Sequence, residues 1–188
     1  LRVLGQIAKT FVVAEGPDGL YLIDQHAAHE RVLYERISDR FERNIPDVQG
    51  LLDPMVVELP TVLSDLLEAQ KNTWIRYGFD IEHFGPDAYI LRSVPSALSR
   101  LDPTATLTSL LEEVSHGSIN SSADIVKGIA MSIACHSSVR AGKKLAHDEM
   151  TNLLSELEMT RIPGACPHGR PTMVHITSDN LERQFGRR

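Results

Sequence analysis

The stretch LYLIDQHAAHERVLYE, residues 20–35, decides the fold of this chain because it joins an apolar strand directly to a helix. Residues 20–24 are mostly apolar and suit a strand. From about Ala27 to Arg43, apolar residues such as Val32 and Phe41 come close to helical spacing. This junction therefore places the last side chains of the strand beside those of the first helical turn.

Turn residues and apolar patterns predict the other elements. Residues 6–15 suit a strand, which the turn Gly16–Gly19 joins to residues 20–24. The elements predicted further along are, in order, a strand over 55–59, a helix over 61–77 stopped by Gly78, a hairpin of 79–83 and 88–94, a helix from Asp102 to about Val114, a loop over 116–122, a largely buried helix over 123–141, a helix capped by Asp148 up to Met159, a strand over 172–177 and a helix capped by Ser178 or Asp179 up to Phe185.

This mixed order of elements predicts an α+β protein in two subdomains, with the middle one inserted into the outer one. The length of 188 residues is sufficient for one compact domain or two small subdomains. No apolar run approaches the length needed to cross a membrane. Because the first residue is Leu1, we expect the chain to be part of a longer protein.

Composition limits the functional classes. The two cysteines, Cys135 and Cys166, give no disulfide framework, which fits a reducing, cytoplasmic setting. The formal net charge of −6 argues against a protein that grips DNA through its own basic surface. That objection is met if acidic residues gather around divalent cations, which reverse the local charge, or if another protein delivers the DNA.

The first candidate site is the segment Asp24–Glu30. His26 and Glu30 are four residues apart, so one helical turn places them on a common face, with Asp24 at the strand end beside it. A carboxylate, an imidazole and a second carboxylate resemble a divalent metal site. The alternative is an acidic helix start, where carboxylates favour the helix dipole and the histidines are only exposed.

The second candidate site is the Pro- and Gly-rich segment Cys166–Pro171. A Cys and a His two residues apart in a rigid loop can direct a thiolate and an imidazole at one ion, a pairing that favours zinc. A plain turn with a buried thiol is the alternative. Cys135 and His136 lie in a buried-looking helix, where core packing is the default role of a cysteine.

The segment Gln49–Pro54 is a different kind of signal. It follows a helix and precedes a strand, with Leu51 and Leu52 expected to be exposed on the connection. Such a segment suits a short linear peptide that docks in the apolar groove of another protein. The alternative is a linker whose leucines lie under the neighbouring subdomain.

Taken together, these motifs resemble the endonuclease-bearing C-terminal domain of MutL proteins. DQHAAHERVLYE, from Asp24 to Glu35, matches the family's acidic metal-binding motif, and CPHGRP, from Cys166 to Pro171, is similar to a later one. The segment at Cys135 and the terminal Phe-x-Arg ending in Arg187 resemble two further motifs. Gln49–Pro54 is similar to the peptide with which such proteins bind the replicative sliding clamp.

The resemblance implies a dimerisation subdomain with the metal site, residues 1–48 and 130–188, and an inserted external subdomain, residues 49–129. It implies a homodimer that nicks DNA in mismatch repair, in the cytoplasm at the nucleoid. Its partners would be DNA, the sliding clamp, a mismatch-recognition protein and an N-terminal ATPase domain that is absent here, with no membrane. Nothing in the chain resembles that ATPase's nucleotide-binding motifs, so we expect no ATP site.

The resemblance also implies roles for individual residues. The expected metal ligands are Asp24, His26, Glu30, Cys135, Cys166 and His168. The expected catalytic residues are Asp24, His26, Glu30 and Arg170, with Arg170 as a phosphate contact. The expected clamp-binding residues are Gln49, Leu52 and Pro54, and His136 and Arg187 are additional candidates. Manganese or magnesium would be catalytic and zinc structural or regulatory.

Two other functions fit the same motifs. The first is a non-catalytic dimerisation and clamp-docking module with structural zinc, which predicts an ion closed off by thiolate and imidazole ligands. The second is an unrelated metallohydrolase for a small substrate, which predicts a deep apolar pocket. The paired acids Asp24 and Glu30 favour the nuclease over the structural zinc site.

Overall fold

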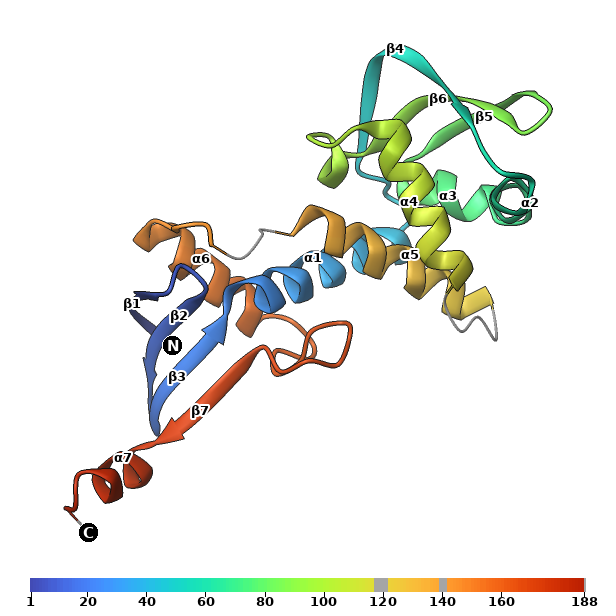
Figure 1. Ribbon diagram of the computed structural model, residues 1–188. Coiled ribbons are helices and arrows are strands. Elements are labelled where there is room, and N and C mark those ends of the chain that lie inside the picture. Colours follow the sequence, from blue (N-terminus) through green and yellow to red (C-terminus); the bar gives the residue numbers. More distant parts are fainter. Residues whose placement is uncertain (117–121, 139–141, 188) are drawn as a thin grey trace. The chain divides into compact units, whose positions relative to one another are not determined.

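The computed structural model describes residues 1–116, 122–138 and 142–187 (Figure 1). The chain divides into two compact units, the first made of Leu1–Glu35 with Ser138–Arg188 and the second of Arg36–Ser137. Each unit combines a sheet with helices, so the α+β class is confirmed. The expected subdomain boundaries, after residue 48 and before residue 130, fall inside the second unit. No helix in the described ranges is long and apolar enough to cross a membrane.

The first unit is built on an antiparallel sheet with the strand order β1-β2-β3-β7. Its strands are β1 (Arg2–Ile7), β2 (Phe11–Gly16), β3 (Gly19–Asp24) and β7 (Met173–Thr177). The prediction of one strand over 6–15 was wrong, because Ala8 and Lys9 turn the chain with φ of 50° and 51°. Tight turns of this kind usually carry Asn or Gly, so the residues at this hairpin did not indicate a turn.

Three helices belong wholly or partly to the first unit. They are the start of α1 (Gln25–Glu42), α6 (His147–Glu158) and α7 (Ser178–Gln184). The caps differ from those predicted, by two residues for α6 and by at least one for α7. Helix α6 begins before Asp148, where the backbone N–H of Ala146 donates to Glu149 Oε2 at 2.8 Å. Thr177, in place of Ser178 or Asp179, caps α7 by accepting from the backbone N–H of Asn180 at 3.2 Å.

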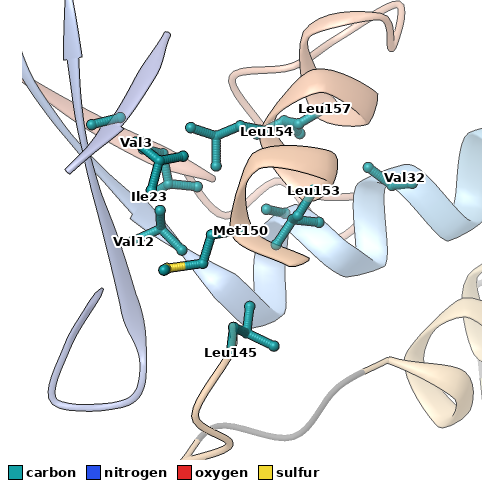
Figure 2. Packing of buried hydrophobic residues seen from close by; sticks show 11 residues of the cluster. Val3, Val12, Ile23, Val32, Leu145, Met150, Leu153, Leu154 and Leu157 are labelled. Carbon is teal, nitrogen blue, oxygen red and sulfur yellow. The ribbon is translucent and has the colours of Figure 1, made fainter. Parts of the chain in front are cut away.

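The core of the first unit lies between its sheet and helices α1 and α6 (Figure 2). Val12 and Ile23 point from β2 and β3 toward Leu153 and Leu157 of α6, and all four are buried. Val32 of α1 joins the same cluster. The apolar face of the first half of α1 is therefore used for packing, which fixes the direction of its polar face.

The second unit is built on a three-stranded antiparallel sheet with the strand order β4-β6-β5. Its strands are β4 (Val48–Glu58), β5 (Asp80–Gly85) and β6 (Ala88–Pro95). Its helices are the end of α1, α2 (Thr61–Ala69), α3 (Lys71–Tyr77), the 3₁₀ turn η1 (Ser96–Leu98), α4 (Pro103–His116) and α5 (Ser122–Ser137). Trp74 and Phe79 pack edge to face in its core.

Local sequence patterns predicted most of the turns and helix ends of the second unit. The hairpin of β5 and β6 is confirmed, and Gly78 ends α3 in the left-handed conformation with φ of 105°. Asp102 Oδ1 accepts from the backbone N–H of Ala105 at 2.7 Å, a bond that lowers the pKa of this carboxyl. The single helix over 61–77 was wrong, because Gln70 leaves the helical region with φ of −120°.

Two of the predicted elements extend beyond the described residues. Most of the loop predicted over 116–122 and the end of the helix predicted over 123–141 lie outside them. The part of α5 that is described carries buried residues on several sides, among them Ile129, Ile133 and Ala134. The expectation of a largely buried helix is confirmed for this part.

Gly19 is the residue on which the joining of β3 to β7 depends, and it generates a prediction. Its φ is 141°, and a Cβ atom there would lie 2.3 Å from the carbonyl oxygen of Ile176 on β7. We expect Gly19→Ala to lower the free energy of unfolding by about 2 kcal/mol, from backbone strain and the clash with β7. Urea denaturation measures this loss.

Gly5→Ala is the matched control for this prediction. Gly5 lies on β1 of the same sheet, and a Cβ atom there meets no atom within 4 Å. Equal stability of the Gly19→Ala and Gly5→Ala proteins would contradict the role assigned to Gly19.

Candidate metal centre

The N-terminus of α1 holds the first group of candidate side chains. Asp24, the last residue of β3, accepts hydrogen bonds through Oδ1 from the backbone N–H groups of His26 and Ala27, at 2.9 and 3.0 Å. Asp24 therefore caps the helix, as the acidic-helix-start interpretation expected. On the other side of this turn, His26 Nδ1 lies 3.1 Å from Ser138 Oγ, which fixes the imidazole ring.

Glu30 is the centre of the site. Its side chain is 0% exposed, although a carboxylate in such a position is costly unless cations and donors compensate it. His26 Nε2 lies 3.2 Å from Oε1, so the predicted stacking of these residues one turn apart is confirmed. That contact is not aligned as a hydrogen bond, and Oε1 is a buried oxygen with no hydrogen-bond partner.

The other carboxylate oxygen of Glu30 faces the loop between α6 and β7. His168 Nδ1 lies 3.5 Å from Oε2, and the guanidinium of Arg170 donates to it at 3.1 Å. Two loop residues far from Glu30 in the chain, Arg170 being 140 positions away, thus contact one oxygen of its carboxylate. Hydrogen bonds within the backbone of the loop keep His168 and Arg170 in these positions.

The loop is folded by its own backbone. The carbonyl of Cys166 accepts from the N–H of Gly169 at 2.9 Å, and the N–H of Cys166 donates to the carbonyl of Arg170 at 2.8 Å. Gly169 has φ of 79°, a conformation that favours glycine at this turn. Buried Thr172 closes the base of the loop, where its N–H donates to the carbonyl of Gly164 at 3.2 Å.

Contacts with α1 and β3 then place the loop beside Glu30. The backbone N–H of Asp24 donates to the carbonyl of Thr172 at 2.9 Å. Buried Arg31 donates through Nε to the carbonyl of Ala165 at 2.6 Å, immediately before Cys166. Because Arg31 follows Glu30 on the same helix, one turn of α1 fixes both the carboxylate and the loop that faces it.

Glu35, the last acid of the motif, supports Arg31. Its Oε1 lies 3.4 Å from Arg31 Nη1, and its Oε2 lies 3.7 Å from Arg161 Nε. No supporting role was predicted from the sequence for either residue, although Glu35 closes the motif DQHAAHERVLYE. The signal for their pairing was a spacing of four residues on a helix, which is common and by itself unspecific.

Glu30, Cys166 and His168 together form a compact set of donor atoms. One oxygen, one sulfur and one ring nitrogen lie within 4.8 Å of one another, the tightest such set in the described part of the chain. Cys166 is buried, whereas the side chain of His168 is 38% exposed, so the set is open to solvent on one side. Of the residues that the family resemblance groups around an ion, the structure thus brings Glu30, Cys166 and His168 together, and their role as metal ligands stays a prediction.

Arg170 completes the polar contacts of this set. A hydrogen bond with Cys166 and the negative charge of Glu30 raise the pKa of its guanidinium above its ordinary value. The guanidinium therefore carries a full positive charge against Glu30, and its side chain is 58% exposed. Its expected role as a phosphate contact stays a prediction.

The remaining candidate residues are not members of this donor set. Cys135 and His136 are on α5 in the second unit, where His136 Nε2 lies 2.9 Å from Glu113 Oε1. Arg187 follows α7, which Figure 1 places at the opposite end of β7 from the Cys166 loop. Ligand or catalytic roles for Cys135, His136 and Arg187 stay predictions, as does the role of Asp24 beyond its cap.

The segment Gln49–Pro54 is not the connection that the sequence indicated, because it belongs to strand β4. Gly50 pairs with Ser93 of β6 and Met55 with Leu91, so the four residues between them stand opposite Arg92 alone. Such a bulge displaces the strand from its partner. Leu52 is 98% exposed, as expected, whereas Leu51 is half-buried.

The chain is an α+β protein that brings a carboxylate, a thiol and an imidazole, three common metal-binding groups, into one set. Comparison with known proteins gives its family. The family model described as "MutL C terminal dimerisation domain" matches residues 4–145, so the chain belongs to this family.

Relatives that are named DNA mismatch repair protein MutL match nearly the whole chain. The protein of Sphingopyxis alaskensis is 40% identical over 185 residues, 98% of this chain and 31% of the relative. That of Rhodopseudomonas palustris strain CGA009 is 41% identical over 184 residues, 97% and 31% of the two chains. That of Clostridium perfringens strain 13 is 36% identical over 187 residues, 100% and 28%. The chain thus spans about a third of the length of these relatives.

Proposed function

We propose that this chain is a metal-dependent DNA-nicking and homodimerisation domain of a MutL-type mismatch-repair protein, recruited by the sliding clamp. The observation that carries the proposal is the buried carboxylate of Glu30 in one group with Cys166 and His168. A buried oxygen without a donor costs free energy, and Oε1 of Glu30 is such an oxygen. A cation bound to the group would remove this cost.

The donor set fits the metals expected from the sequence. The thiolate of Cys166 and the imidazole of His168 suit zinc, whereas the carboxylate of Glu30 also suits manganese or magnesium. His26 and Cys135 are further proposed ligands, and His26 is already oriented by Ser138. Divalent ions bound here would supply polarisation of a phosphodiester and activation of the attacking water.

The chain's own residues would bind and orient the DNA backbone at this group. The half-exposed guanidinium of Arg170 matches the geometry of phosphate oxygens. Asp24 keeps its backbone in place through the cap and would bring a second carboxylate to the open side of the group. The exposed side of His168 leaves room for a backbone phosphate, as a nuclease requires.

The sheet of the first unit supports the proposal of a homodimer. Val13, Leu22 and Val174 are cross-strand neighbours on β2, β3 and β7. They alternate with Val12 and Ile23, which face the core, and Val174 is 57% exposed. An apolar row on the outer face of a sheet is suited to pairing with a second copy of the same surface.

The rival function is a non-catalytic dimerisation module with structural zinc. One observation favours it, because the compact donor set contains one carboxylate and Asp24 is engaged as a helix cap. The two functions differ in whether a metal-loaded chain cuts DNA. The nicking experiment below separates them.

The first prediction concerns the metal. We expect Cys166→Ala and His168→Ala to weaken zinc binding by more than about tenfold, since even residues behind metal ligands contribute that much. Metal analysis after dialysis against a buffered zinc concentration measures the loss. His175→Ala is the matched control, because His175 stacks on Tyr21 in the sheet, with ring centroids 4.3 Å apart. Unchanged zinc content in both site variants would show that Cys166 and His168 are not zinc ligands.

The second prediction concerns nicking. Asp24→Asn keeps an oxygen for the helix cap but removes the charge, so we expect a folded dimer with nicking reduced at least about a hundredfold. Conversion of supercoiled plasmid to the nicked form with manganese, with and without clamp, measures this. Asp18→Asn, in the exposed turn between β2 and β3, is the control. Glu30→Gln is a second site variant that leaves the buried side chain uncharged.

Nicking at the parental rate by both Asp24→Asn and Glu30→Gln would end the nuclease proposal. A parent that binds zinc and does not nick DNA under any of these conditions would support the structural-zinc rival. Sedimentation velocity on each variant shows whether the dimer is retained, so loss of activity is separated from loss of assembly.

The third prediction concerns the clamp. We expect Gln49→Ala combined with Leu52→Ala to weaken binding to the bacterial sliding clamp about tenfold or more, because exposed anchor residues dominate such interfaces. Surface plasmon resonance on immobilised clamp measures the affinity. Val56→Ala is the matched control, since Val56 is 55% exposed on the same strand but outside the segment. Equal affinity of the double variant and the parent would exclude this segment as the docking peptide.

A further inference from the structure

The inference concerns what neutralises Glu30 when no ion is bound, and it rests on the metal site of the proposed function. We propose that Arg170 is a built-in counter-ion of the Glu30 carboxylate, which competes with the incoming divalent cation and is displaced when the cation binds. Arg170 would then set the metal affinity of the site and would be released toward solvent by metal binding.

The contacts of Glu30 support this role. Its side chain is 0% exposed, and the guanidinium of Arg170 makes the hydrogen bond to Oε2, at 3.1 Å. His26 and His168 also face the carboxylate, at 3.2 and 3.5 Å, but each carries a charge only when protonated. Of these three neighbours, Arg170 is the one that is positively charged at every physiological pH.

The same guanidinium also contacts the second donor of the site. A hydrogen bond with Cys166 is the largest cause of the raised pKa of Arg170, ahead of the charge of Glu30. Arg170 thus contacts two of the three groups that would bind the ion, Cys166 and Glu30. A guanidinium and a divalent cation on the same pair of donors repel each other, and the repulsion is strong where water is excluded.

The loop allows the side chain to leave without unfolding. The backbone of Arg170 is held by its carbonyl, which accepts from the N–H of Cys166 at 2.8 Å. Its side chain is 58% exposed, in contrast with the buried side chains of Glu30 and Cys166. The guanidinium can therefore turn outward while the donor atoms keep their places.

A consequence follows for the substrate. A guanidinium released from Glu30 is available for a phosphate, so binding of the cation and binding of a phosphodiester support each other. Linkage requires the effect to be mutual, and a phosphate that holds Arg170 outward must raise the metal affinity by the same factor. Arg170 thus has two alternative partners: the carboxylate of Glu30 in the metal-free site and a phosphate when the cation is bound.

The test is the zinc affinity of Arg170→Gln in the whole chain, measured by competition with a chromogenic chelator. We expect zinc to bind about tenfold more tightly than to the parent, because the substitution removes a positive charge that repels the ion at the same donors. Arg170→Lys keeps a positive charge beside the carboxylate, so its zinc affinity is expected to lie closer to that of the parent than to that of Arg170→Gln. Arg161→Gln is the charge-matched control, because Arg161 is 61% exposed and pairs with Glu35.

A second measurement uses the metal-free protein. We expect Arg170→Gln to lower the melting temperature in excess chelator, and Glu30→Gln in the same chain to restore it, since the two changes remove both partners of one pair. Additive effects of these two changes would overturn the counter-ion role.

The affinity measurement has three outcomes. Weaker or equal zinc binding by Arg170→Gln, with zinc bound by the parent, would overturn the competition and leave the metal site intact. Absence of zinc binding by the parent would overturn the metal site and the competition together. Tighter binding by Arg170→Gln alone, with Arg161→Gln unchanged, supports the inference.

Discussion

The buried charge of Glu30 is the constraint around which the first unit is organised. A carboxylate that is 0% exposed is tolerated only with compensating groups at contact distance. Those groups come from the same helix turn, His26, and from the distant loop, His168 and Arg170. The demand of one carboxylate therefore explains why a loop near the C-terminus lies against a helix near the N-terminus, and why imidazole and guanidinium groups gather there.

The loop could not satisfy this demand if it were free to move. Arg31 binds the carbonyl of Ala165, and Glu35 holds Arg31 from the next turn of α1. Arg31 and Glu35 thus hold the loop against one face of α1, while Val32 on another face packs in the core (Figure 2). Packing, loop position and donor geometry thus depend on residues 30–35 of a single helix, so a disturbance of this segment reaches all three.

Local patterns predicted what depends on local structure, and failed where tertiary structure decides. Helical spacing placed His26 beside Glu30, and the turn residues Gly16–Gly19 placed the hairpin of β2 and β3. The turn at Ala8 and Lys9 was missed because it carries none of the residues that usually mark a tight turn. The bulge after Gly50 was missed because Gly50 and Pro54 suit a connection between elements as well as a bulge within a strand. Spacing alone did not place Cys166 against Glu30 across 136 residues; that expectation came from the family resemblance. Arg31 and Glu35 were missed because a salt bridge on a helix looks the same whether it lies in solvent or holds a loop.

The net charge of −6 acquires a physical meaning in this arrangement. An acidic chain repels a phosphodiester, and in the metal-free site the exposed cation nearest Glu30, Arg170, is already committed to that carboxylate. In the proposed function a bound divalent ion adds positive charge to the site and also frees the guanidinium of Arg170 for a phosphate. Affinity for DNA at the site then depends on the metal and on delivery by partners more than on the protein surface. A domain built in this way is expected to cut where other proteins place it, because alone it has little electrostatic hold on DNA.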